Sequence, residues 1–133
     1  MSPETINLPK ADEFQAYNYI MLFSSGNIKI GMTTDPLGRI KQLSNSNSGG
    51  FKLVDAEFSQ PHYIADTVEK VLHWQYHENR VEGEFFSELD YEEVKKHFFS
   101  MFERRDFINS NNVRKDFCLT NHRQRPSSKK KYD

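Results

Sequence analysis

The sequence is poor in cysteine and in long apolar runs, and both absences limit what the protein can be. Its single cysteine, Cys118, cannot form an internal disulfide and has no cysteine neighbour for a zinc site. No apolar run approaches the length needed to span a membrane, and the amino terminus lacks the basic and apolar segments of a secretory signal. The chain also has no internal repeat, P-loop or Rossmann glycine pattern. We therefore expect a cytoplasmic protein with no membrane partner.

The composition indicates one folded domain with polar extensions. Hydrophobic residues make up 36% of the 133 residues, charged residues 28% and aromatic residues 14%, which is enough apolar material for one compact core. We expect a flexible N-terminal arm over residues 1–14, a folded domain over residues 15–106 and a basic C-terminal extension over residues 107–133.

The charge is distributed unevenly along the chain. Seven Lys or Arg against two acids give +5 from Arg114 onward, so residues 1–113 carry −6 of the net −1. The basic side chains of the final segment are Arg123, Arg125, Lys129, Lys130 and Lys131. Such a segment can add a salt-sensitive attraction to nucleic-acid phosphates without reading sequence, or it can be a disordered solubilising tail. Both interpretations stay open.

Two strands joined by a tight turn form the centre of the predicted fold. Residues 17–24 carry apolar side chains on both parities, which is typical of a central strand. The SGN segment at 25–27 tolerates the positive φ that a hairpin turn needs. Residues 28–32 then run back beside the first strand, with Lys29 on the opposite side from their apolar residues. The pattern therefore presents Lys29 on one face of the strand pair.

Helices and a third strand are predicted around this hairpin. A cap within the TTD segment at 33–35, with Pro36 in the first turn, predicts a helix over about residues 36–43. The remaining predicted elements are a loop at 44–50, a strand at 51–58, a helix at 63–76 and a helix beginning at Asp90. The predicted fold class is α+β, with a small three-stranded antiparallel sheet flanked by helices and a flexible basic C-terminal tail.

Local geometry brings three polar side chains towards one patch. Tyr19, Lys29 and Arg39 follow one another at intervals of ten residues, on the two strands and near the start of the first helix. Glu69 and His73 lie one turn apart on the same side of the next helix, so a carboxylate and an imidazole point together. Such a pair is common on protein surfaces, and it gains weight only from its place after the hairpin and Arg39.

Taken in order, the motifs resemble the GIY-YIG nuclease superfamily over residues 15–104. The matching segments are Tyr17-Asn18-Tyr19, Lys29-Ile30-Gly31, Arg39, Glu69 to His73, and Gly83-Glu84-Phe85-Phe86. The chain is most similar to the short branch common in phages, DNA viruses and bacteria, whose second motif reads KIG. By itself, the VEGEFF segment at 81–86 indicates packing: a turn followed by two aromatic side chains at the edge of a core. The resemblance implies a GIY-YIG-like fold and the cytoplasm of a bacterial or infected host cell.

Three positions depart from the superfamily pattern. Tyr17 replaces the glycine that begins the first motif, and Lys29 replaces the second tyrosine, which leaves the identity of the base open. Leu43 stands where some members carry a histidine one turn after the arginine. Tyr19 keeps the position of the superfamily tyrosine.

The resemblance implies a divalent-metal-dependent endonuclease that hydrolyses DNA phosphodiester bonds with water. Glu69 is expected to hold Mg²⁺ or Mn²⁺, and Arg39 to stabilise the phosphate. Tyr19 is expected to orient or deprotonate the water. Lys29 either steadies the phosphate as an ammonium or is itself the base. Tyr17 and His73 are expected to support this set from outside, with packing an equal alternative for His73.

DNA is the expected partner, and Lys41 and Lys52 are expected to add to its binding together with the basic tail. Whether RNA is also accepted stays open, as does selectivity, which a homodimer or a partner protein can supply. An alternative is an inactive module of the same fold that binds DNA or protein, which the −6 charge of residues 1–113 favours. A third possibility is self-association through the aromatic helix that begins at Asp90.

Overall fold

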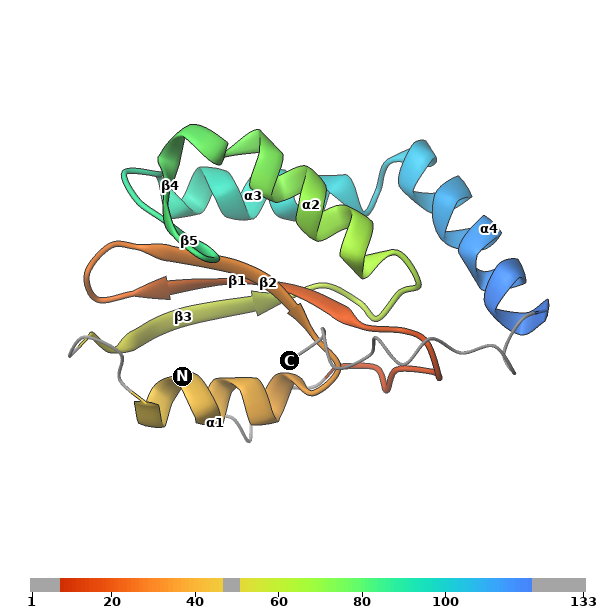
Figure 1. Ribbon diagram of the computed structural model, residues 1–133, viewed down its shortest axis with the longest axis horizontal. Coiled ribbons are helices and arrows are strands. Elements are labelled where there is room, and N and C mark those ends of the chain that lie inside the picture. The colour runs from red at the N-terminus through yellow and green to blue at the C-terminus, as the bar shows by residue number, and fades with distance from the viewer. Residues whose placement is uncertain (1–7, 47–50, 121–133) are drawn as a thin grey trace.

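The computed structural model describes residues 8–46 and 51–120. In these ranges an antiparallel sheet of five strands, in the order β3-β1-β2-β5-β4, is flanked by four α-helices (Figure 1). The strands are β1 (Tyr17–Phe23), β2 (Ile28–Thr33), β3 (Leu53–Phe58), β4 (Arg80–Glu82) and β5 (Phe85–Phe86). The helices are α1 (Pro36–Ser46), α2 (Ala65–Gln75), α3 (Tyr91–Met101) and α4 (Arg105–Thr120), with a 3₁₀ turn, η3 (His77–Asn79).

The β1–β2 hairpin is the centre of the sheet, as the sequence predicts. Its strands pair in a register that sets Tyr19 opposite Gly31 and Met21 opposite Lys29. Gly26 turns the chain with a φ of 92°, which favours glycine because a Cβ is disfavoured there. Residues directly opposite in an antiparallel pair point to the same face. Tyr19 and Lys29 therefore share one face of the hairpin.

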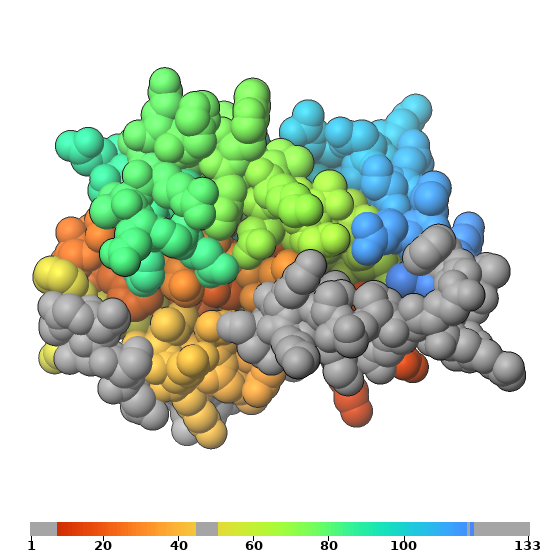
Figure 2. Space-filling model, in the orientation of Figure 1, coloured from red at the N-terminus to blue at the C-terminus, as the bar shows by residue number. Residues whose placement is uncertain are grey.

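The two faces of the sheet are covered by different helices. In Figure 1, α1 lies on one side of the sheet, and α2 and α3 lie on the other. Figure 2 shows the same layers in space-filling form, with a narrow strip of the orange hairpin residues visible between the green and amber layers. The sheet thus has a buried core on each side, and β1 contributes to both.

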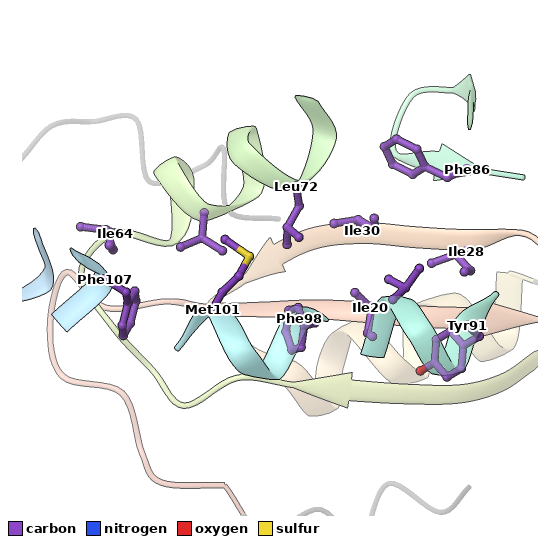
Figure 3. Packing of buried hydrophobic residues seen from close by; sticks show 12 residues of the cluster. Ile20, Ile28, Ile30, Ile64, Leu72, Phe86, Tyr91, Phe98, Met101 and Phe107 are labelled. Carbon is purple, nitrogen blue, oxygen red and sulfur yellow. The ribbon is translucent and has the colours of Figure 1, made fainter. Parts of the chain in front are cut away.

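Each core is built from apolar residues that the periodicities predict. On the side of α2 and α3, the hairpin residues Ile20, Ile28 and Ile30 pack with Leu72 and Phe98 (Figure 3). On the side of α1, the buried residues are Tyr17, Tyr19, Met21, Phe23, Ile40, Ala56 and Phe58. Because Phe98 is part of the interior, the aromatic face of α3 acts mainly as core.

Side-chain caps fix where two helices begin. Asp35 Oδ1 accepts a hydrogen bond from Gly38 N–H at 3.1 Å, so the aspartate of the TTD segment is the residue that caps α1. Asp90 accepts from Glu92 N–H at 3.0 Å at the start of α3. Helix α1 continues to Ser46, beyond the expected end at residue 43. The last part of the expected loop, residues 47–50, lies outside the described ranges.

The prediction of three strands was wrong, because β4 and β5 were missed. They have three and two residues, too few to show an alternating pattern, and β4 is exposed throughout. Phe86 is nevertheless fully buried, so the predicted packing role of the VEGEFF segment is confirmed for that residue.

The first part of the expected basic C-terminal extension, residues 107–133, is helical, because residues 105–120 form α4. Phe107 is only 7% exposed and packs in the α2–α3 core. Asn111 Oδ1 accepts from Tyr63 N–H at 2.7 Å, which fastens α4 to the start of the α2 segment. The predicted basic tail residues from 123 to 131 lie outside the described ranges. Within those ranges, no helix has the length and apolarity that a membrane crossing requires.

A buried polar cluster joins β1 to the segment before α2. His62 Nε2 lies 2.6 Å from Asn18 Oδ1, and Asn18 Nδ2 donates to Ala65 O at 3.0 Å. The His62 ring also contacts Phe102 and Phe107 edge-on, at 5.4 and 5.1 Å between ring centroids. Burial lowers the pKa of His62 to about 4, so the imidazole is neutral at neutral pH.

Candidate active site

Tyr19 lies at the centre of the candidate site, and Gly31 makes room for it. The Tyr19 side chain comes from β1 on the α1 side of the sheet, and the residue is 1% exposed. A Cβ at position 31 would lie 2.5 Å from Tyr19 Oη and 2.7 Å from Glu84 Oε1. The glycine of the KIG motif is therefore required by close approach, since any other side chain would displace the phenol.

Lys29 is held beside Tyr19 by a carboxylate and an aromatic ring. Its Nζ lies 3.1 Å from Glu84 Oε1, and its side chain is 12% exposed. The same ammonium lies 4.9 Å from the centroid of the Phe85 ring, a cation–π distance. These contacts hold the Lys29 side chain on the face of the hairpin that carries Tyr19.

Glu84 joins the site without having been predicted from the sequence. Its Oε1 accepts a hydrogen bond from Tyr19 Oη at 3.3 Å as well as pairing with Lys29. The backbone fixes its place: Gly83 turns the chain with a φ of 53°, and Glu84 O accepts from Ile30 N–H at 3.0 Å. The only available signal was the glutamate of the GEFF motif, because no periodicity marks a residue in so short a turn.

Glu69 reaches the site from α2, on the other side of the sheet from α1. His73, one turn further along α2, lies 2.8 Å from Ile30 O through its Nε2, and the carbonyl can only accept, so Nε2 carries the proton. The His73 ring also packs on Phe86, with centroids 5.1 Å apart. His73 thereby fastens α2 to the outer edge of β2. Strand β5 pairs with Ile28 and Lys29, so this part of the edge lies past the end of β5.

Arg39 and Glu69 both affect the pKa of Tyr19. Burial, followed by the Glu84 carboxylate, raises the pKa of the Tyr19 phenol above its ordinary value. Arg39, near the start of α1, lowers the same pKa, and Glu69 raises it. The phenol is therefore protonated at neutral pH.

The Glu69 carboxylate is itself strongly perturbed. Burial raises its pKa to about 7, with a further increase from Glu84 and an opposing effect of Lys29. Two carboxylates and one ammonium thus interact beside the phenol. The pKa of Tyr19 is thus affected by Glu84, Arg39 and Glu69. The pKa of Glu69 is in turn affected by Glu84 and Lys29.

Other predicted residues lie apart from this group. Tyr17 Oη donates to Pro9 O at 2.5 Å and so fastens the segment before β1. Lys41 is exposed on α1, and Lys52 is exposed at a point where its N–H donates to Ser24 Oγ at 2.9 Å. Their expected role in nucleic-acid binding stays a prediction, as does that of the five basic tail residues.

The candidate site contains a carboxylate of the kind that binds Mg²⁺ or Mn²⁺. In the part of the chain that the structure describes, no cluster of three or more His, Cys, Asp or Glu could enclose a metal ion. Mg²⁺ usually keeps several waters and takes one or two carboxylates plus phosphate oxygens. Glu69 offers such a carboxylate at a half-buried position, where burial raises its pKa.

Comparison with known proteins gives one match. The model of the T5orf172 domain family matches residues 16–102, from the start of the central hairpin to the end of α3. No curated protein and no solved structure matched the chain. The matched segment contains all five residues of the candidate site, Tyr19, Lys29, Arg39, Glu69 and Glu84. The chain therefore belongs to the T5orf172 domain family, which is related to nuclease-type domains.

Proposed function

We propose that the protein is a divalent-metal-dependent DNA endonuclease of the GIY-YIG type. The observation that carries the proposal is the contact of the Tyr19 phenol and the Lys29 ammonium with one carboxylate, Glu84, and Arg39 and Glu69 support it through their electrostatic effects on Tyr19. These groups come from four different elements, yet they act on one another electrostatically. Membership of a family related to nuclease-type domains supports the same conclusion.

The two cations suit a phosphodiester. Arg39 presents a planar fork of donors that matches phosphate oxygens, and it stabilises the additional negative charge that develops when water attacks phosphorus. Lys29, kept in place by Glu84 and Phe85, adds a second positive charge. Their joint role is to hold the phosphate and to favour the crowded transition state.

Glu69 is the residue that would hold Mg²⁺ or Mn²⁺. When bound, such an ion supplies positive charge to the phosphate oxygens and to the leaving oxygen. Glu69 must be deprotonated to bind it, and its pKa of about 7 means that bound metal and protons compete for this carboxylate near neutral pH. Tyr19 is a neutral phenol here, so it acts by hydrogen bonding and proton transfer and does not start as a phenolate.

The test is cleavage of supercoiled plasmid, single-stranded DNA, branched DNA and RNA with Mg²⁺, Mn²⁺ or EDTA. We expect metal-dependent cleavage of at least one DNA, and a loss of about 10²-fold or more in Arg39→Ala and Glu69→Gln. Gln42→Ala, exposed on the same helix as Arg39, is the matched control and should cleave like the wild type. Circular dichroism checks that each variant is folded.

A binding module without catalysis is the second candidate. The observation in its favour is that Lys29 is already paired with Glu84 at 3.1 Å, in a segment of net negative charge. DNA binding that persists in EDTA, with no product from any substrate in either metal, would support the module and contradict the nuclease.

A further inference from the structure

We propose that Glu84 is the proton acceptor for Tyr19, so that the Tyr19–Glu84 pair together forms the base of the reaction. This inference rests on the proposed nuclease function and adds a residue and a proton path to it. Glu84 acts through Tyr19 and does not itself contact the scissile phosphate, so it is a positioning residue with respect to the substrate.

The hydrogen bond between the two side chains has a defined direction. Glu84 Oε1 receives Tyr19 Oη at 3.3 Å and Lys29 Nζ at 3.1 Å. An ionised carboxylate only accepts, so the phenol proton of Tyr19 points at Oε1. The lone pairs of Oη are then left for another donor, such as the attacking water.

The approach of the two side chains is built into the fold. Directly after the turn at Gly83, Glu84 O accepts a hydrogen bond from Ile30 N–H at 3.0 Å. A Cβ at position 31 would lie 2.7 Å from Glu84 Oε1 and also 2.7 Å from Tyr19 Cζ, so Gly31 opens the space in which the two meet. The contact therefore depends on three separate features of the backbone.

The chemistry explains why an acceptor is needed. Tyr19 is almost fully buried and lies near two carboxylates, so it does not ionise in advance. A neutral phenol is a poor base unless its own proton leaves as it takes one up. Glu84 is the group that Tyr19 already donates to, and it can receive that proton without any movement of the backbone.

The step balances in protons and electron pairs. The water oxygen forms a bond to phosphorus while one water proton moves to Tyr19 Oη, and the phenol proton moves from Oη to Glu84 Oε1. The bond from phosphorus to the leaving oxygen breaks, and its electron pair stays on that oxygen, which then takes a proton from solvent. Glu84 later releases its proton to water, for which its 39% side-chain exposure is sufficient, and Tyr19 is again a neutral phenol.

Lys29 is the second partner of the Glu84 carboxylate. Its Nζ lies 3.1 Å from Glu84 Oε1, the same oxygen that accepts from Tyr19 Oη. A bound phosphate gives Lys29 a second anionic partner beside Glu84. In this proposal Lys29 binds anions, and the proton path runs through Tyr19 and Glu84.

The experiment compares Glu84→Gln, Glu84→Asp and Tyr19→Phe with the wild type on whichever substrate the wild type cleaves. We expect Glu84→Gln and Tyr19→Phe each to lower kcat by about 10²-fold or more with little change in KM. The double variant should be no slower than either single variant, because both changes break the same path. Glu84→Asp should recover part of the rate, and Glu82→Gln, an exposed glutamate two residues earlier, is the matched control.

Two further measurements separate this role from others. Mn²⁺ affinity, followed by electron paramagnetic resonance well above pH 7, where protons no longer compete for Glu69, should not fall in Glu84→Gln. A large loss would make Glu84 a metal ligand and overturn the proposal. In protein with ¹³C-labelled tyrosine, the Tyr19 Cζ shift should change in Glu84→Gln and not in Glu82→Gln.

The outcomes also distinguish this proposal from the nuclease proposal. Wild-type cleavage with an unimpaired Glu84→Gln, or with fully additive effects of Glu84→Gln and Tyr19→Phe, overturns the role of Glu84 and leaves the nuclease intact. Absence of cleavage by the wild type on every substrate overturns the nuclease, and the proton path with it. An unchanged Tyr19 Cζ shift in Glu84→Gln overturns the hydrogen bond whatever the activity.

Discussion

A methyl group at position 31 would collide with both members of the Tyr19–Glu84 pair, which makes Gly31→Ala a sharp test of the site. The nearest atoms are the ends of side chains, so the phenol and the carboxylate would move and the strand would stay in place. We expect a loss of unfolding free energy of about 1–3 kcal/mol, typical of overpacking, and a larger proportional loss of kcat. Chemical denaturation and cleavage rates measure the two effects, and wild-type kcat in the variant would contradict the geometry.

His62 makes the stability of the protein depend on pH. Burial lowers its pKa from 6.5 to about 4, so between these values the unfolded chain binds a proton that the folded chain does not. The free energy of unfolding is therefore highest above pH 6.5, where His62 is neutral in both states. It falls by up to about 3 kcal/mol as the pH falls from 6.5 towards 4.

Urea denaturation between pH 4 and 7 measures this dependence. The slope should be shallower in His62→Gln than in the wild type, whatever the absolute stability of the variant. Equal slopes in the wild type and His62→Gln would show that His62 has the same pKa in the folded and unfolded chain, which would contradict the prediction.

At this scale the sequence predicts some site residues and not others. Tyr19, Lys29 and Arg39 could be grouped because a hairpin and a following helix impose short-range geometry. Glu84 could not, because its side chain is directed by an irregular turn between two very short strands. The roles assigned to all of these residues stay predictions until cleavage is measured.

Among the elements, α4 is a helix that the sequence analysis did not predict. Phe107 anchors it in the α2–α3 core, so Phe107→Ala should lower the free energy of unfolding by about 3–5 kcal/mol. Ile108→Ala, at the exposed neighbouring position, should change it by less than about 0.5 kcal/mol. Thermal and urea unfolding give both values, and a Phe107→Ala protein as stable as the wild type would mean that α4 is dispensable to the core.

The elements that were predicted have strong periodic patterns or caps. The β1–β2 hairpin, β3, α1, α2 and α3 each bury a regular face or begin at a recognisable cap. Helix α4 was missed because its apolar residues are few and follow no continuous stripe, so its position is set by the Phe107 contact and by the Tyr63–Asn111 hydrogen bond. Tertiary contacts thus decide what local pattern leaves undetermined.

For the whole molecule, the uneven charge predicts how DNA binding responds to salt. Residues 121–133 contain five Lys or Arg, and residues 1–113 carry −6. Because α4 extends to Thr120, truncation after that residue removes the basic segment and leaves the described fold complete. We expect the slope of log K against log salt to become shallower by up to about 4 units. An unchanged slope in the truncated protein would assign this segment a solubilising role.

The pairing of Tyr19 with Gly31 across the hairpin restricts which insertions this chain can accept near the loop between β1 and β2. Adding one residue to either strand would slide the register and turn every following side chain to the wrong face. A slide of two would restore the faces but bring a lysine or a threonine, in place of the glycine, against the phenol. Changes in loop length are therefore compatible with the Tyr19–Gly31 contact only where the turn bulges outward and leaves the pairing of the two strands unchanged.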